Sequence, residues 1–179
     1  ECRKRILKDN IKLYDIYLDT FGGAEIYVCG NLISEDKWLR KKSKLMLIYL
    51  MINRGLRFTK DTMLELFFGE LSADSAENIF LQAITNIRNV VKPDGLLQDS
   101  ETKEQVKPKK SKDSSPSFIV YEDKILRLAA GQHYKVDVMD FDNLVKQIKS
   151  SETDNDTKEK LAKEAIDIYK GEFLPGYYD

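Results

Sequence analysis

The first apolar positions of the chain come in three short runs, at residues 17–21, 24–29 and 32–33. Glycine and asparagine separate these runs at 22–23 and 30–31, and both residue types tolerate the positive φ angles of tight turns. Short apolar runs broken by tight turns are typical of neighbouring antiparallel strands. The N-terminal part of the chain therefore predicts a small antiparallel sheet.

Helical spacing takes over after the sheet. Residues 37–53 predict a first helix whose second half, 45–52, is almost wholly apolar and should be buried on most sides, and Gly55 marks its end. Thr59 is a good N-cap for a second helix, which Gly69 ends. The apolar stripe of this second helix consists of Met63, Leu64, Phe67 and Phe68.

A third helix over 75–92 carries the most information. Asp74 and Glu77 have the spacing of a variant capping box at its start. Its core stripe recurs at helical spacing, with Phe80, Ile84, Ile87 and Val91. The opposite face carries the amides Asn78, Gln82, Asn86 and Asn89, flanked by Ile79, Ala83 and Thr85. Amides offer a donor and an acceptor together and can read base edges, but the same pattern also fits a plain solvated face.

The remaining third of the chain predicts a loop, a hairpin and two helices. Residues 94–117 are polar and rich in lysine without periodicity, which predicts a flexible loop. Two apolar runs within 118–128 flank Glu122, Asp123 and Lys124, which predicts a β-hairpin, and a further strand or extended segment is expected over 134–138. Two amphipathic helices follow, joined by a polar, acidic loop, and should pack as an antiparallel pair.

Charge is divided unevenly along the chain of 179 residues, although its formal net charge is only −1. Residues 36–54 carry six cations against the single acid Asp36, whereas acids outnumber bases after residue 137. This division fits a basic, DNA-facing half joined to an acidic, protein-facing half. Two ordinary solvated faces would give the same charge pattern. The six cations are Lys37, Arg40, Lys41, Lys42, Lys44 and Arg54.

Candidate chemistry is sparse. The two cysteines, Cys2 and Cys29, lack metal-ligand spacing, and Cys29 in its strand-like run is expected to be buried. The single histidine, His133, has no nucleophile or carboxylate pattern near it. Nothing resembles a phosphate loop or a catalytic triad, so we expect no enzyme activity, no metal and no cofactor. No apolar run reaches the roughly 20 residues of a membrane span, so we expect no membrane partner.

The termini add two expectations. Arg3, Lys4 and Arg5 are followed by no apolar stretch, which speaks against a signal peptide and for a cytoplasmic protein. The first residue is Glu1 rather than methionine, which suggests a fragment of a longer protein.

The order of elements predicts an α+β fold: a winged helix-turn-helix with an N-terminal antiparallel sheet and a C-terminal β-hairpin wing, followed by an α-helical hairpin like the start of a tetratricopeptide array. In this order, the chain resembles SARP-type transcription activators, which join an OmpR/PhoB-like winged helix to a bacterial transcriptional activation domain. The segments that carry the resemblance are 20–23 (TFGG), 38–44 (WLRKKSK), 53–55 (NRG), 64–68 (LELFF), 76–78 (AEN), 82–88 (QAITNIR), 136–141 (VDVMDF) and 169–179 (YKGEFLPGYYD).

The resemblance implies a division into three parts. Residues 1–16 are a linker or the end of a preceding domain. Residues 17–138 form the DNA-binding domain, with the lysine-rich insertion at 94–117, and residues 139–179 begin a helical activation domain. Such a chain is the output domain of a bacterial signalling protein, as in response regulators of two-component systems. Dimerisation on direct repeats, as a homodimer, follows from the resemblance and not from these residues.

The resemblance also implies site residues. Double-stranded DNA would be read by the third helix and held by the wing at 118–128. The loop between the second and third helices would contact RNA polymerase through Gly69, Glu70, Leu71, Ser72, Ala73 and Asp74. The expected DNA-binding residues are Gln82 and Asn86 at the bases, Thr85, Arg88 and Asn89 near phosphates, Asn78 and Ala83 on the same helix, and Lys124 and Arg127 in the wing.

One departure from the family keeps an alternative open. Family members have several arginines on the third helix, but this chain has Glu77, Leu81, Asn86 and Asn89 where basic residues are common, and keeps only Arg88. Phosphate contacts supply much of the affinity of such complexes, so each missing cation weakens binding. The alternative is a degenerate winged helix that binds a protein and has weak or no affinity for DNA.

Overall fold

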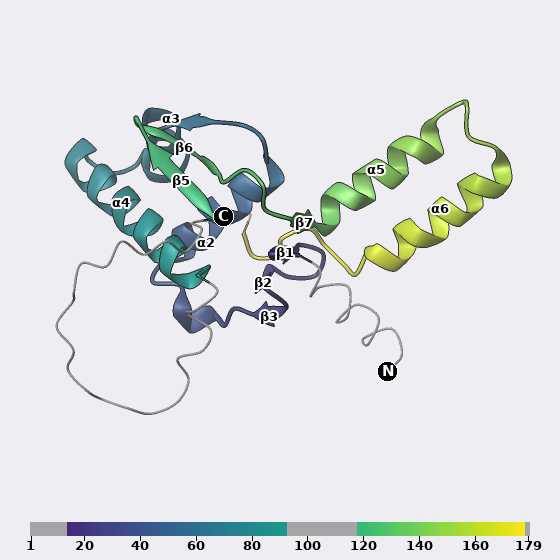
Figure 1. Ribbon diagram of the computed structural model, residues 1–179, viewed down its shortest axis with the longest axis horizontal. Coiled ribbons are helices and arrows are strands. Elements are labelled where there is room, and N and C mark those ends of the chain that lie inside the picture. Colours follow the sequence, from purple (N-terminus) through teal and green to yellow (C-terminus); the bar gives the residue numbers. More distant parts are fainter. Residues whose placement is uncertain (1–13, 93–117, 178–179) are drawn as a thin grey trace. The chain divides into compact units, whose positions relative to one another are not determined.

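The computed structural model describes residues 14–92 and 118–177 (Figure 1). They form two compact units, one made of residues 14–33 and 133–177, the other of residues 34–92 and 118–132. The predicted α+β architecture is confirmed: an N-terminal sheet, helices, a β-hairpin and two C-terminal helices follow one another in the expected order. The predicted lysine-rich loop at 94–117 lies outside the described residues. The division at residues 16/17 and 138/139 stays a prediction.

The first unit is built on a four-stranded sheet in the order β3-β2-β1-β7. β1 pairs antiparallel with β2, with Ile16 opposite Val28. β7 pairs with the other edge of β1 in parallel, with Leu18 beside Val136. The sheet therefore joins segments more than a hundred residues apart. Its strands are β1 (Ile16–Asp19), β2 (Glu25–Val28), β3 (Asn31–Leu32) and β7 (Tyr134–Val136).

Two local expectations about this unit are wrong. Cys29 is exposed rather than buried, because it lies in the turn after β2 with a positive φ of 48°. Val138 is helical rather than part of the strand, because the chain changes conformation at Val136 and α5 begins at Asp137. Alternation of apolar residues over 134–138 did not reveal this change.

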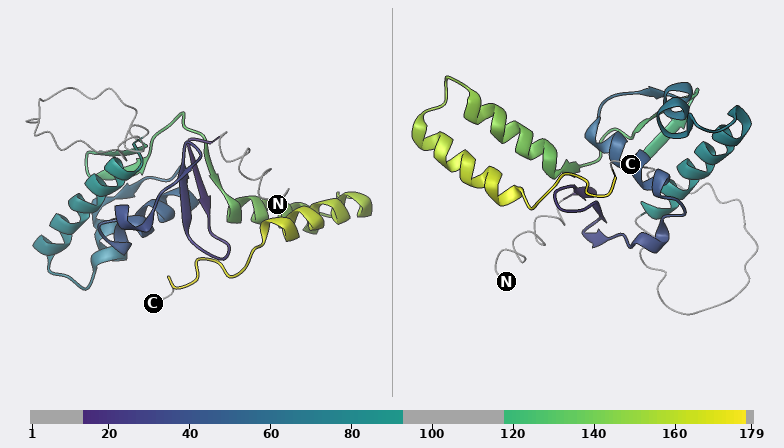
Figure 2. Two further views of the ribbon diagram at one scale, coloured as in Figure 1. Left: turned by 90° about the horizontal axis from the view of Figure 1, so that it is seen from below. Right: turned by 180° about the vertical axis from the view of Figure 1, so that it is seen from behind.

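The two C-terminal helices, α5 (Asp137–Lys149) and α6 (Asn155–Ile168), pack side by side as an antiparallel pair, as predicted (Figures 1 and 2). The Asp154 side chain caps α6 by accepting a hydrogen bond from the Thr157 backbone N–H at 2.9 Å. The Phe21 ring joins the pair to the end of β1, because it makes edge contacts with Phe141 and Tyr169 at centroid distances of 5.3 and 5.2 Å.

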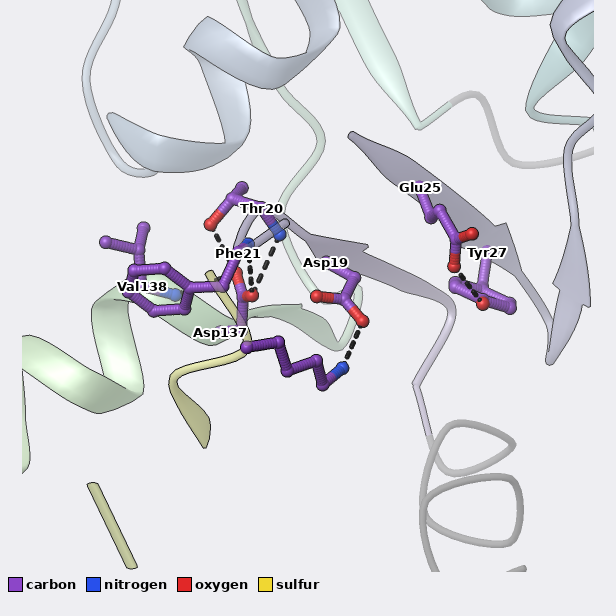
Figure 3. A network of polar contacts seen from close by, with 8 residues as sticks. Asp19, Thr20, Phe21, Glu25, Tyr27, Asp137 and Val138 are labelled. Atoms are coloured by element: carbon purple, nitrogen blue, oxygen red, sulfur yellow. Dashed lines mark hydrogen bonds and ion pairs between the residues drawn. The ribbon is translucent and has the colours of Figure 1, made fainter. Parts of the chain in front are cut away.

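A buried carboxylate connects the start of α5 to the end of β1 (Figure 3). Asp137 is only 3% exposed and accepts hydrogen bonds from the Thr20 N–H at 2.8 Å, the Phe21 N–H at 3.0 Å and the Thr20 hydroxyl at 2.5 Å. Beside it, Asp19 forms an ion pair with Lys170, which follows α6. Burial raises the pKa of Asp19 to about 6, against the opposing effect of Lys170.

The second unit contains the predicted helix-turn-helix and wing. A three-stranded sheet in the order β4-β6-β5 packs beside three α-helices (Figure 1). Asp123 and Lys124 form the two-residue turn of the wing with φ of 50° and 60°, as a type I′ hairpin requires. The elements are η1 (Glu35–Lys37), α2 (Lys41–Ile52), β4 (Phe58–Thr59), α3 (Lys60–Phe68), α4 (Ala73–Val90), β5 (Ile119–Glu122) and β6 (Ile125–Leu128).

The core of this unit follows the predicted stripes. The four stripe residues predicted for the third helix, the last of them the C-cap of α4, are all at most 2% exposed. Of the stripe predicted for α3, Met63 and Phe68 are equally buried, whereas Leu64 and Phe67 are half-buried. The Phe80 ring meets Tyr121 of β5 edge-on at 5.4 Å, which joins α4 to the wing. The apolar second half of α2 is buried, as predicted. The α4 stripe consists of Phe80, Ile84, Ile87 and Val91.

Helix starts differ from the prediction. The first helix begins at Lys41, because residues 35–37 form a separate 3₁₀ turn. The third begins at Ala73 with Ser72 as its N-cap, which places Asp74 inside the first turn. The predicted N-cap of the second helix is confirmed, since the Thr59 hydroxyl accepts a hydrogen bond from the Thr62 N–H at 3.2 Å.

We expect Asp137→Asn to lower the free energy of unfolding by about 2–4 kcal/mol. The substitution replaces one carboxylate oxygen by an –NH₂ group, which cannot accept a hydrogen bond from the donors of Thr20 and Phe21. Urea unfolding followed by circular dichroism measures this change. Asp142→Asn, on the exposed side of α5, is the matched control and should change stability little. Equal stability of the two variants would contradict the structural role of Asp137.

The raised pKa of Asp19 predicts a specific pH dependence. A group whose pKa is raised from 3.8 to about 6 on folding stabilises the fold at low pH, and this contribution is lost as pH rises through 6. Relative to Asp19→Asn, the wild type should therefore lose stability between about pH 4 and 6, with a constant difference above that range. Urea unfolding of both proteins across this range tests the prediction, which a pH-independent difference would refute.

Candidate nucleic-acid interface

One face of α4 is open to solvent and lines a shallow groove of about 410 Å³. Leu39, from the segment before α2, lines the same groove and is 76% exposed. Leu81 of α4 is 42% exposed. The groove therefore combines amides and a hydroxyl with two exposed leucines. The α4 residues that line it are Asn78, Leu81, Gln82, Thr85, Asn86 and Asn89.

Four of the predicted contact residues of α4 are exposed together, as the sequence suggests: Asn78, Gln82, Thr85 and Asn89. They follow one another at spacings of three or four residues, so they form one row along the helix. The Thr85 hydroxyl donates a hydrogen bond to the Leu81 carbonyl at 3.0 Å, which leaves its methyl group as an apolar part of this face.

Asn86, by contrast, is not on the exposed face. It is 5% exposed; its Oδ1 accepts a hydrogen bond from the Leu39 N–H at 3.2 Å, and its Nδ2 donates one to the Lys37 carbonyl at 3.1 Å. The side-chain amide therefore binds the backbone of residues 37–39 instead of presenting its groups to solvent. The expectation that Asn86 is exposed is wrong.

Ala83 is also buried, with 2% of its surface exposed, so its expected place on the flank of the open face is wrong. It packs with the core because it lies three residues after Phe80, on the edge of the apolar stripe. Arg88 lies between the two faces and is half-buried. Its Nε atom is buried with no hydrogen-bond partner among the described residues.

The charged groups around α4 are mostly paired within the protein. Glu77 forms an ion pair with Lys60 at the start of α3, with 2.9 Å between Nζ and Oε2, and this contact raises the pKa of Lys60. Within residues 73–90, Arg88 is the sole basic residue. The exposed face of α4 therefore presents uncharged polar groups and leucine.

The wing turn lies beside the first turns of α4. The Lys124 carbonyl accepts a hydrogen bond from the Lys60 N–H at 2.7 Å, and Lys60 in turn pairs with Glu77 of α4. The Lys124 side chain is exposed at the turn. Arg127 is half-exposed and donates a hydrogen bond from Nη1 to the Leu128 carbonyl at 3.4 Å.

A second cation follows the groove lining in sequence. Asn86 holds the backbone of Leu39, which lines the groove, against α4, and the next residue, Arg40, is exposed. Arg40 belongs to the basic cluster noted at 36–54, and the contact that brings this segment to the third helix has no local signal in the sequence.

The loop expected to contact RNA polymerase spans the end of α3 and the start of α4. Gly69 is the C-cap of α3, whereas Ala73 and Asp74 already belong to α4. Glu70 forms an ion pair with Lys42 of α2, which lowers the pKa of Glu70. The loop is therefore tied to α2 at Glu70, while Leu71 is 37% exposed.

Among residues 14–92 and 118–177, no group of three or more histidine, cysteine, aspartate or glutamate side chains is placed to hold a metal ion. None of the helices in this part of the chain has the length and apolar character needed to cross a membrane.

Comparison with solved structures decides the fold. Mycobacterium tuberculosis EmbR, solved in complex with a low-affinity phosphopeptide, superposes with a TM-score of 0.60 over 90% of this chain at 13% sequence identity. EmbR is a SARP-family regulator with an OmpR-like winged helix-turn-helix and a bacterial transcriptional activation domain. The chain has this fold. The resemblance predicted from the sequence is therefore confirmed at the level of structure.

The match spans only part of the larger protein, since it covers 37% of the EmbR chain. No protein-family model matches the sequence. No curated protein matches it either.

The position of Asn86 yields a prediction. Asn86→Ala should lower the free energy of unfolding by about 1–3 kcal/mol, because the Leu39 N–H and the Lys37 carbonyl lose their partner. Asn89→Ala, one helical turn away and exposed, should change stability by less than about 0.5 kcal/mol. Thermal or urea unfolding separates the two, and equal effects would show that Asn86 does not hold the 37–39 segment.

Proposed function

We propose that this chain is the DNA-binding part of a transcription regulator and is not an enzyme. The observation that carries the proposal is the uncharged, amide-bearing face of α4, exposed on the helix that an OmpR-like winged helix inserts into the major groove. Side-chain amides on such a helix can pair with base edges. A cytoplasmic location follows from this function.

Each group has a proposed role. Gln82 lies in the middle of the row and contacts bases, with Asn78, Thr85 and Asn89 along the same face. Lys124 and Arg127 of the wing contact phosphates, and Arg40, next to Leu39 of the groove, also contacts the DNA backbone. Asn86 and Ala83 are left out of this set because they are buried. Arg88 is left out as well, because it is half-buried, its Nε atom is buried, and it does not line the groove.

The electrostatic attraction to DNA is modest in this proposal. Lys60 and Lys42 are engaged by Glu77 and Glu70. The wing turn also carries Glu122 and Asp123 beside Lys124. Within the described residues, Lys124, Arg127 and Arg40 are the cations proposed for phosphates, so affinity should be low and its salt dependence shallow. The lysines of 94–117, which could add phosphate contacts, lie outside the described residues. The loop at 69–74 is proposed to contact RNA polymerase through its exposed residues, such as Leu71.

A specific observation favours a second candidate. Leu39 and Leu81 are exposed in the same groove, and exposed leucines on a face poor in cations are also typical of a surface that binds a protein. In that case the winged helix would be an interaction module with weak or no affinity for DNA. The two candidates differ in whether duplex DNA binds with a salt-dependent affinity.

Fluorescence anisotropy with labelled duplexes at several salt concentrations tests the proposal. We expect binding that weakens with salt, and Lys124→Ala should reduce the slope of log K against log salt by about 1, the loss of one phosphate contact. Lys160→Ala, exposed on α6, is the matched control and should leave the slope unchanged. Absence of binding at low salt would overturn the proposal in favour of the interaction module.

A further inference from the structure

The exposed face of α4 carries a restricted set of chemical groups, and this set limits which bases it can recognise. The inference rests on the proposed function and specifies its substrate. We propose that the α4 groove reads A·T base pairs, with Gln82 and its neighbouring amides on adenine and with Leu81 against thymine methyl groups.

The major groove presents a different pattern for each base pair. Guanine is recognised mainly by arginine or lysine, which donate two hydrogen bonds to O6 and N7. Adenine is recognised by asparagine or glutamine, because the amide can accept from N6 and donate to N7 at once. Thymine differs from the other bases by its C5 methyl group, which favours apolar contacts.

α4 has the groups for adenine and thymine and lacks those for guanine. Its one basic residue, Arg88, is half-buried, with its Nε atom out of reach of solvent. Asn78, Gln82 and Asn89 are exposed amides. Among residues 73–90, Arg88 alone could donate two hydrogen bonds to guanine, and it is not one of the residues that line the groove.

The polar and apolar groups lie side by side on this face of α4. From Asn78 to Asn89 the polar row spans twelve residues, or about 16 Å of helix, which matches four or five base pairs of duplex. Leu81 lies one turn before Thr85 of this row and adds an exposed apolar side chain beside it. Leu39 lines the opposite side of the groove. The surface that would face the bases thus contains side-chain amides next to apolar side chains that can contact thymine methyl groups.

Charge favours DNA as the occupant of this groove over an acidic or basic protein segment. The carboxylate of Glu77, which adjoins the row, is neutralised by Lys60. Arg40 is exposed and directly follows Leu39, which lines the groove. An exposed cation next to an uncharged centre fits a ligand with charged edges and a neutral middle, which describes the phosphate backbones and base edges of a duplex.

The first experiment is a selection with the whole chain and a duplex library randomised over one helical turn, about 10 base pairs. We expect enrichment of sequences in which a run of A·T pairs is bordered by positions of little preference. Gln82→Ala should weaken the preference for adenine at one position by about tenfold. Enrichment of G·C pairs at the centre, or binding without any sequence preference, would overturn the inference.

The second experiment isolates the thymine methyl group without changing the protein. Replacing thymine by deoxyuridine in the most enriched duplex keeps base pairing and removes the methyl group. We expect affinity to fall about three- to fourfold for each methyl group in contact. In Leu81→Ala the same replacement should have no effect at that position. Leu66→Ala, an exposed leucine of α3 outside the groove, is the matched control and should behave as the wild type.

The outcomes separate this inference from the proposed function. Salt-dependent binding with a G·C preference, or with no response to deoxyuridine, keeps the DNA-binding function and overturns the A·T assignment. Lack of any binding to the library, for a chain whose circular dichroism spectrum shows a folded protein, overturns both. Sensitivity to deoxyuridine that disappears in Leu81→Ala but persists in Leu66→Ala supports the assignment.

Discussion

The candidate interface depends on the two hydrogen bonds that the buried amide of Asn86 makes to the backbone of residues 37–39. They fix an irregular segment against α4 and thereby set the distance between Leu39 and the exposed helix face. A backbone N–H and a carbonyl outside regular structure need partners when they are buried, and one amide satisfies both. The groove is therefore a product of this contact as much as of the helix itself.

The pattern of apolar residues predicted those elements in which apolar side chains face the core and polar side chains face solvent. The stripe from Phe80 to Val91 is regular because each of its members faces the core, and the wing hairpin is marked by two apolar runs on either side of a polar turn. β4 was missed because two residues, Phe58 and Thr59, are too short to show a period. β7 was expected as a strand, but its parallel partner β1 could not be inferred from a pattern that contains only local information.

The site was predictable only in part, for a physical reason. Asn78, Gln82 and Asn89 are exposed where the helical pattern places them, but Asn86 lies on the border between the two faces, where the pattern leaves burial open. Its environment is decided by a segment 47 residues earlier in the chain. The ion pairs Lys60–Glu77 and Lys42–Glu70 likewise join residues of different elements, which the pattern of a single helix does not reveal. They engage Lys60 and also Lys42, one of the cations counted at 36–54.

The parallel pairing of β1 with β7 has a consequence for the order in which a ribosome-bound chain can fold. Residues 34–132 are continuous, so every partner in the second unit is available once they have been synthesised. The sheet of the first unit lacks an edge strand until residues 134–136 emerge, and the buried carboxylate that ties Thr20 to α5 comes one residue later. Closing such a long loop carries an entropic cost that is smaller once the intervening chain is compact. The second unit could then fold before β7 is available to pair with β1.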